Sequence, residues 1–219
     1  MQGRGILYVS TFNVFVYICT EFEIMSENIK VPSTEFGVHP MIMNRWSARA
    51  FSDQMIDDTT LNRLFEAASW SASSMNEQPW KYLYAKKGSA AFDAMIDCLM
   101  DGNKPWAKNG SVMLLSLAKR TFVRNGVTNR HHMHDVGAAN STLLMQAAED
   151  DIYGHMMGGF HMDKTLEAFN IDPQEYEVAC FIILGYLDRP ESLEEPFQSR
   201  ETSPRTRKSI SDFTQHIEL

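Results

Sequence analysis

Ser71-Ala-Ser-Ser-Met-Asn-Glu-Gln-Pro-Trp80 combines small hydroxyl side chains, an amide pair, a proline and a tryptophan in one short stretch. It follows a helical pattern of apolar residues that the acidic pair Asp57-Asp58 could cap, and an extended pattern comes after it. The stretch is therefore expected to connect a helix to a strand. Its Ser73, Ser74 and Asn76 side chains offer hydrogen-bond donors and acceptors to a flat ligand with polar edges.

A second segment, Arg45-Trp-Ser-Ala-Arg49, lies upstream and places two guanidinium groups around a hydroxyl. Arginine binds phosphate through paired, charge-assisted hydrogen bonds, so this composition suits a phosphate group. Taken alone, such a segment is more often a solvated surface turn, and serine and asparagine commonly close turns. The two segments together predict a phosphorylated, planar ligand.

The two segments resemble the nitroreductase family of FMN-dependent oxidoreductases, in which corresponding segments line the flavin. The similarity continues through Asp135-Val-Gly-Ala-Ala-Asn140, which resembles the start of the family's buried central helix. It then reaches Met156-Met-Gly-Gly-Phe160 and Arg205-Thr-Arg-Lys208, the second of which resembles a basic C-terminal signature. These segments occur in the family's order, and the similarity runs from about Asn44 to Phe213.

The resemblance implies a set of residues that bind FMN. They are Arg45, Trp46, Ser47, Arg49, Ala72, Ser73, Ser74, Asn76, Met157, Gly158, Gly159, Arg205 and Arg207. In this set the phosphate is bound by Arg45, Ser47 and the two tail arginines, and Arg49 lies beside N1 and the C2 carbonyl of the ring. A backbone N–H at Gly158-Gly159 donates to N5. Many relatives have a Glu where this chain has Gly158, so a side-chain carboxylate is missing at that point.

The same resemblance implies an intertwined homodimer in which Ser73, Ser74 and Asn76 reach the flavin of the partner subunit. It also implies an FMN-dependent NAD(P)H oxidoreductase, with NADH or NADPH as electron donor. The acceptor would be a small molecule: a nitroaromatic, a quinone or a related conjugated electrophile. FMN brings the reactivity, so no side chain is expected to act as a nucleophile or an obligatory base. Donor and acceptor would use the site in turn, which predicts ping-pong kinetics.

The composition fits one domain in a reducing compartment. The chain has 219 residues and a formal net charge of −8, which argues against nucleic acid as a partner. Cys19, Cys98 and Cys180 are odd in number and widely spaced, so they indicate neither a disulfide framework nor a thiolate metal site. A cytoplasmic location is the expectation.

The first part of the chain differs from the rest. Residues 6–19 are mostly apolar and aromatic, but this run is too short to span a bilayer comfortably and lacks the features of a secretory signal. No membrane association is expected. Residues 1–40 are interpreted as an N-terminal extension. Its first part is an extra strand, an arm that covers a partner, or a translated upstream stretch of a protein whose natural start is Met25. Residues 41–219 are interpreted as the FMN-binding domain with a C-terminal arm.

The chain predicts an α+β fold. Four segments have the apolar or extended pattern of strands, and they are Trp80–Ala85, Val112–Ala118, Ile152–Met157 and Val178–Leu184. Helical periodicity precedes the first strand, returns around Phe92 to Leu99, and reappears from Val136 to Ala148, where nearly every face is apolar or small. The last of these helices is expected to be central and buried. The predicted architecture is a mixed sheet flanked by helices.

Two other functions remain open from the residues alone. His131, His134 and Asp135 have a spacing seen for metal ligands on a helix, and His155 and His161 could complete a site for a metal-dependent hydrolase. The cluster lacks the Glu base of a His-Glu-x-x-His motif, which counts against this alternative. The other alternative is a non-enzymatic flavin-binding protein, which only reduction kinetics would distinguish from a reductase.

Four further residues have only weak assignments. Asn103 and Lys104 lie where relatives often place polar contacts to the pyrimidine edge of the flavin, and Phe122 and Arg124 could face the acceptor. The identity of the acceptor and the choice between NADH and NADPH leave no signature in the sequence. A dinucleotide-binding Gly-x-Gly-x-x-Gly turn after a strand is absent, which a flavin enzyme can do without.

Overall fold

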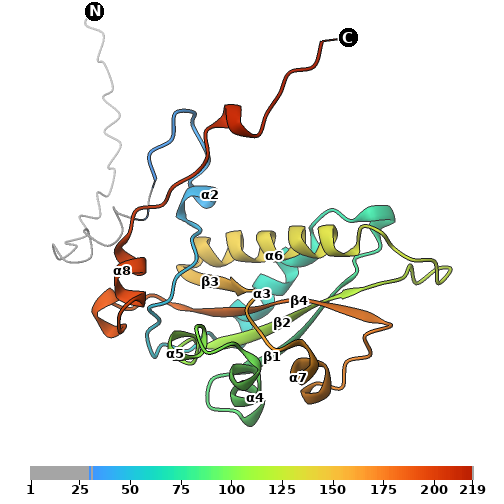
Figure 1. Cartoon of the computed structure of the whole chain (residues 1–219), viewed down its shortest axis with the longest axis horizontal. Coiled ribbons are helices and arrows are strands. Elements are labelled where there is room, and N and C mark those ends of the chain that lie inside the picture. Colours follow the sequence, from blue (N-terminus) through green and yellow to red (C-terminus); the bar gives the residue numbers. More distant parts are fainter. Residues whose placement is uncertain (1–29, 31, 219) are drawn as a thin grey trace, which may run out of the picture.

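The computed structural model describes residues 30 and 32–218 (Figure 1). The proposed start at Met25 and the residue Cys19 lie outside this range. The strands are β1 (Trp80–Lys86), β2 (Val112–Lys119), β3 (Ile152–Met157) and β4 (Tyr176–Tyr186). The α-helices are α2 (Pro40–Asn44), α3 (Asp58–Ser69), α4 (Ala90–Cys98), α5 (Lys104–Ala107), α6 (His132–Glu149), α7 (Met162–Ala168) and α8 (Phe197–Thr202). Short 3-10 turns cover Ser74–Asn76 (η1), Pro190–Ser192 (η2) and Ile210–Asp212 (η3).

The four strands form one sheet in the order β1-β2-β4-β3, which confirms the four predicted strands and the α+β class. The prediction of a mixed sheet was wrong for the described residues, because all three pairings are antiparallel. The connection through α6 does join two strands of the same direction, β2 and β3. Both pair with β4, which lies between them, so no parallel pairing forms.

Helices cover both faces of this sheet, which explains why strands of an antiparallel sheet have continuous apolar runs. Helices α3 and α6 pack on one face, where Leu64, Leu114 and Leu143 belong to one buried cluster. Helices α4, α5 and α7 lie on the other face, around a second cluster that contains Phe92 and Trp106. Figure 1 shows the two layers above and below the sheet.

Helix α6 is anchored to the sheet by a buried polar network. The Tyr82 hydroxyl donates to Asn140 Oδ1 at 2.8 Å, and the Ser116 hydroxyl donates to the same oxygen at 3.0 Å. Burial raises the pKa of the Tyr82 phenol and raises that of the nearby Cys180 thiol to about 12. Both groups therefore stay protonated at neutral pH, and the network is a structural contact between helix and sheet.

The outer face of α6 is open in the single chain. Gly137 and Ser141 are exposed, while Val136, Ala139 and Leu143 on the inner face are buried. The expectation of a helix buried on nearly every face is thus met for one face only. Small residues on the open face leave room for a second element to approach the backbone closely.

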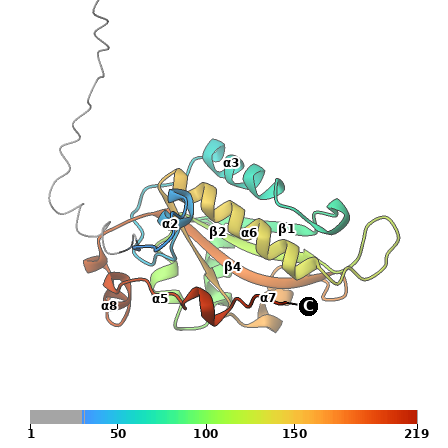
Figure 2. The same ribbon diagram turned by 90° about the horizontal axis from the view of Figure 1, so that it is seen from above.

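Two arms stand away from the domain. Residues 32–44 and 203–218 rise side by side from the same end of the molecule, and the C-terminal arm points away from the body (Figures 1 and 2). Six apolar side chains on these arms are between 40% and 67% exposed: Phe36, Val38, Ile42, Ile210, Phe213 and Ile217. Within the part of the chain that the structure describes, no helix is long and apolar enough to cross a membrane.

Candidate functional site

The loop between α3 and β1 is held by the start of α6. Asp57 caps α3 as predicted, since its carboxylate accepts from the Thr60 N–H at 2.9 Å. After α3 ends, the Ser74 N–H donates to Asp135 Oδ2 at 2.9 Å, and the Gln78 N–H donates to the Ser73 hydroxyl at 3.0 Å. Asp135 belongs to the first turn of α6 and is 2% exposed. The loop is therefore tied to the N-terminal end of the long helix.

This loop carries unusual backbone strain. Met75, Asn76 and Gln78 have φ angles of 56°, 56° and 53°, in the left-handed region that side chains disfavour. Residues in this region persist only where their surroundings fix them, and they concentrate at ligand-binding sites. Ala72, Met75 and Asn76 are exposed, so the strained loop presents polar groups to solvent.

Three arginines gather near α2, on the opposite side of the domain from this loop. Arg45 ends α2, and its pKa is lowered first by burial and then by the charge of Arg207. The pKa of Arg205 is lowered by burial and by the charges of Arg45 and Arg207. Among the described residues, no carboxylate forms an ion pair with any of the three. Their mutual repulsion is uncompensated, which suits an anionic group.

The Arg205 guanidinium also fixes the C-terminal arm. It donates to the carbonyl oxygen of Lys30 at 2.9 Å and to that of Met43. Trp46 is half-buried near this point, with the Lys30 ammonium 4.8 Å from its ring centre, and Ser47 is exposed. The predicted phosphate residues Arg45, Arg205 and Arg207 are thus brought together by the arm.

Arg49 lies against a buried carboxylate and an indole. Its backbone N–H donates to Glu201 Oε1 at 2.8 Å, and its guanidinium lies 3.8 Å from Glu201 Oε2. The same guanidinium is 5.7 Å from the centre of the Trp106 ring. Burial lowers the pKa of Arg49, and Glu201 opposes this effect. Arginine remains charged in either case.

His155 on β3 links the same segment to the sheet. Its Nδ1 is 3.0 Å from the Ala48 carbonyl oxygen, and its ring centre is 4.5 Å from that of Trp106. Burial lowers the pKa of His155 to about 4, so the ring is neutral at pH 7 and Nδ1 is the donor to Ala48. Its Nδ1 is thus engaged in holding the Ala48 backbone against β3.

The end of β3 completes this side of the domain. Met157 is buried, and a Cβ added at Gly158 would meet nothing within 4 Å, so the space beside this residue is open. The Gly159 carbonyl accepts from the Met100 N–H and from Asn103 Nδ2, both at 3.0 Å. Neither glycine has a positive φ, and the backbone forms no turn at this pair.

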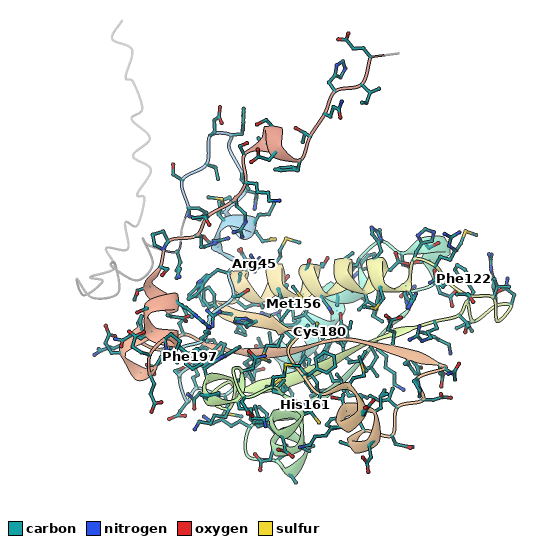
Figure 3. The ribbon with its side chains drawn as sticks, in the orientation of Figure 1. Arg45, Phe122, Met156, His161, Cys180 and Phe197 are labelled. Carbon is teal, nitrogen blue, oxygen red and sulfur yellow. The ribbon has the colours of Figure 1, made fainter. Side chains whose placement is uncertain are left out.

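Two groups of predicted site residues, the arginines around Arg45 and the loop residues Ser73, Ser74 and Asn76, therefore lie at opposite ends of α6. Figure 1 places α2 at the C-terminal end of α6 and the loop that contains η1 at the other end, and Figure 2 agrees from above. Figure 3 shows Arg45 beside the first of these ends and Phe122 near the second. The 18 residues of α6 span about 27 Å. One small ligand cannot touch both groups in a single chain.

The histidines of the alternative metal site do not converge. His132 is bound to the Asn129 carbonyl and to Glu177, at 2.7 and 2.9 Å. His134 contacts Asp135 at 3.0 Å but is 82% exposed. Residues 30 and 32–218 contain no group of three or more His, Cys, Asp or Glu side chains that could hold a metal ion. The described part of the chain thus does not bring together the ligands of the predicted metal site.

The weakly assigned residues have separate surroundings. Asn103 supports Gly159, as described above, whereas Lys104 pairs with Asp101 at 3.2 Å on the surface. Arg124 stacks on Phe122 at 5.5 Å in an exposed hairpin, where Thr121 pairs with Thr128. This hairpin contacts the strained loop, because the Val123 N–H donates to Glu77 Oε1 at 2.6 Å.

Three residues that organise the site were missed from the sequence: Asp135, His155 and Glu201. The sequence predicts only a metal-binding role for Asp135, and its position next to His134 gives no sign of its hydrogen bond to the loop. Glu201 lies in a polar stretch with other acids, and no local pattern distinguishes it from solvated neighbours.

Comparisons with known proteins identify the family and the fold. The family model described as "Nitroreductase family" matches residues 42–186. A crystal structure described as an oxidoreductase containing FMN is 31% identical and has a TM-score of 0.80, covering 85% of this chain and 95% of that one. A structure from Desulfovibrio desulfuricans, described as a candidate nitroreductase in complex with FMN, shares the fold at 18% identity, with a TM-score of 0.68 and coverage of 85% and 99%.

A curated relative gives a shorter match. A Streptomyces coelicolor protein named as a candidate NADH dehydrogenase or NAD(P)H nitroreductase is 28% identical over 76 residues. That match covers 35% of this chain and 37% of the relative's length. The family model, in contrast, covers more than half of the 219 residues and includes the segment with Arg45, the strained loop, α6 and the end of β3. The chain belongs to the nitroreductase family.

Proposed function

We propose that this protein is an FMN-dependent NAD(P)H oxidoreductase that reduces a nitroaromatic, a quinone or a related conjugated electrophile. The single observation that carries the proposal is the group formed by Arg45, Arg205 and Arg207, which has no acidic partner among the described residues. A phosphate dianion would relieve the repulsion within this group. The descriptions of the FMN-containing relatives add support, as does the name of the NAD(P)H nitroreductase relative.

The remaining residues fit the rest of an FMN molecule. Bound FMN would supply two-electron transfer between nicotinamide and acceptor, a chemistry that the protein side chains lack. The Arg49 cation would favour negative charge on the ring, and a backbone N–H at Gly158 or Gly159 would donate to a ring nitrogen. The open space beside Gly158 leaves room for a flat group, and the Asn103 side chain donates a hydrogen bond to the Gly159 carbonyl oxygen. Solvent can provide the protons, since the site has no committed acid.

We further propose a homodimer with two composite sites. Ser73, Ser74 and Asn76 lie at the far end of α6 from Arg45, and a second chain packed in the opposite direction along α6 would bring the two groups together. Exposed Gly137 and Ser141 on the open face suit such close packing, and the apolar arms could wrap the partner. The buried, unpaired thiols of Cys98 and Cys180 are compatible with the cytoplasmic location that we propose.

Mixing two variants tests the composite site. Arg45→Ala breaks one half of each site and Ser73→Ala/Asn76→Ala breaks the other half, so either homodimer should bind FMN poorly. A heterodimer purified with two different tags has one intact site and one doubly altered site. We expect it to bind about one FMN for two chains at a concentration where neither homodimer retains flavin. Equal loss in all three species would count against sites shared between chains.

A visible spectrum with nicotinamide titration tests the enzymatic function. The protein is mixed with FMN, separated from free flavin, and titrated anaerobically with NADH and then with NADPH. Rapid bleaching of bound flavin, followed by reoxidation with a quinone or nitroaromatic in ping-pong kinetics, is the expected result. Bound flavin that resists both nucleotides would instead favour the non-enzymatic flavin-binding protein, for which the same residues would suffice.

A further inference from the structure

Glu201 on α8 is a buried carboxylate that joins two distant parts of the chain. It is 3% exposed, and its Oε1 accepts from the backbone N–H groups of Arg49 and Ala50 at 2.8 and 2.9 Å. Residues 49 and 201 are 152 positions apart in the sequence. One side-chain oxygen therefore holds two successive N–H groups of the segment that carries the predicted phosphate and ring arginines.

The second oxygen of this carboxylate is oriented toward the Arg49 side chain without bonding to it. Oε2 is buried, has no hydrogen-bond partner among residues 30 and 32–218, and lies 3.8 Å from the Arg49 guanidinium. That distance is too long for a hydrogen bond but short enough for a substantial charge interaction in a partly buried setting. Glu201 therefore takes no hydrogen-bond donor from the Arg49 guanidinium, while it partly offsets the charge of that group.

The charges around Glu201 explain how a carboxylate can be buried here. Burial raises its pKa, while the two N–H groups and the charges of Arg49 and Lys30 act in the opposite direction. The charge of Arg200, on the same helix, lowers the pKa of the Arg49 guanidinium. The net surroundings are cationic, and an unpaired buried carboxylate would otherwise be strongly unfavourable.

Neighbouring contacts also hold the same segment against the region around α8. The Lys30 ammonium donates to the carbonyl oxygens of Arg200 and Ser203, at 3.3 and 2.6 Å. Arg205, four residues after Glu201, binds the Met43 carbonyl at the end of α2. The segment with Arg45 and Arg49 is thus fixed at both ends by one short piece of the C-terminal region, with Glu201 at its centre.

We infer that Glu201 is a positioning residue with two effects on the proposed flavin site. Its Oε1 fixes the backbone that carries Arg45 and Arg49, and its charge weakens the effect of Arg49 on the ring. Offsetting the Arg49 cation disfavours the reduced, negatively charged form of the cofactor. Glu201 therefore holds the reduction potential below the value that Arg49 alone would give. The second effect rests on the proposed function, whereas the first is a property of the chain itself.

Two substitutions separate the effects. Glu201→Gln keeps an oxygen for the two N–H groups but removes the charge, whereas Glu201→Ala removes both. Glu194→Gln is the matched control, because it removes the same charge from an exposed position in the same region. Hydrogen exchange at the Arg49 and Ala50 amides reports on the backbone without any flavin. The midpoint potential and the Kd of FMN report on the charge.

We expect Glu201→Gln to retain amide protection and FMN binding while its midpoint potential becomes more positive. Glu201→Ala should lose protection at the two amides and bind FMN several-fold more weakly, and Glu194→Gln should match the unaltered protein in every measurement. An unchanged potential in Glu201→Gln would overturn the charge effect, and unchanged protection in Glu201→Ala would overturn the backbone effect. If Glu201→Ala does not fold, the Glu201→Gln potential still decides. If the unaltered protein binds no FMN, the proposed function fails, and amide exchange alone judges the positioning role.

Discussion

The two ends of α6 prepare for a ligand in different ways. At the C-terminal end, Arg45, Arg205 and Arg207 place like charges together on backbone that has ordinary φ angles. At the N-terminal end, the loop around Met75 carries no such group of like charges, but three of its residues have φ angles between 53° and 56°. One end stores unfavourable energy in charge repulsion and the other stores it in backbone conformation. A bound anion can relieve the first without moving the chain, whereas the second is fixed by the fold.

The difference predicts that substitutions at the charged end change ligand binding and leave the fold intact. Arg45→Ala should weaken FMN binding by about 10- to 100-fold, because a charge-assisted hydrogen bond contributes roughly 1.5–3 kcal/mol. Fluorescence titration of FMN measures the Kd, and thermal unfolding without flavin checks the fold. Lys108→Ala removes one exposed positive charge elsewhere and serves as the control. Stoichiometric FMN retained by Arg45→Ala at low concentration would contradict the assignment of the phosphate site.

His155 makes the charged end sensitive to acid. Its pKa is about 4 in the folded chain and about 6.5 when unfolded, so between these values the unfolded state binds more protons. The stabilising contribution is complete above pH 6.5 and is lost as the pH falls toward 4. We expect the free energy of unfolding to fall by about 2 kcal/mol more in the unaltered protein than in His155→Phe over this window. Urea unfolding at pH 7 and pH 4.5 measures the difference, and His216→Gln, which removes an exposed histidine, is the control. Parallel pH profiles would show that His155 is not the responsible group.

At the strained end, Asp135 should stabilise the fold through its hydrogen bond more than through its charge. Asp135→Ala leaves the Ser74 N–H without its partner, which costs about 1–2 kcal/mol in the free energy of unfolding. Asp135→Asn keeps an acceptor oxygen and should recover most of the loss. Urea unfolding of both variants provides the comparison. An equal loss in the two variants would indicate that the charge, rather than the hydrogen bond, holds the loop.

The smallest expected effect is an increase in stability. Met75 is 66% exposed with a φ of 56°, and Met75→Gly should raise the free energy of unfolding by about 0.5 kcal/mol, because glycine adopts this φ without strain. Ala72→Gly, at an exposed position with no positive φ, should lower stability instead. The two variants change the free energy of unfolding in opposite directions only if backbone conformation determines the effect. Loss of stability in both variants would mean that the free energy stored as backbone strain at Met75 is smaller than the free energy that its side-chain contacts contribute.

The sequence predicts the elements of this fold well because their signals are local. Leu64 and its neighbours have helical spacing, Asp57 has the capping position, and the runs at Val112 and Val178 are long enough to mark buried strands. Strand direction was predicted less well. A continuous apolar run reports that both faces are covered, and helices on both faces produce that pattern in an antiparallel sheet as readily as in a parallel one.

The candidate site was harder to predict because its contacts are distant in sequence. The family motifs predict Arg45 and Ser74 as site residues, but nothing near Glu201 or His155 indicates a bond to residues 48–50, more than 100 positions away. The separation of Arg45 from Ser74 along α6 is also invisible in the sequence, where the two are close. Such information resides in the topology of the chain and not in any local pattern.

The bond between Glu201 and the Arg49 segment also has a consequence for biosynthesis. The sheet is complete once Tyr186 has been made, so the body of the domain can fold while the C-terminal region is still on the ribosome. The contacts between α8 and the Arg49 segment form later, and Arg207, the third arginine of the cluster, is also made later. A chain that ended between Tyr186 and Glu201 would contain all four strands of the described sheet, but it would lack the carboxylate that holds the Arg49 segment and two of the three arginines proposed to bind phosphate.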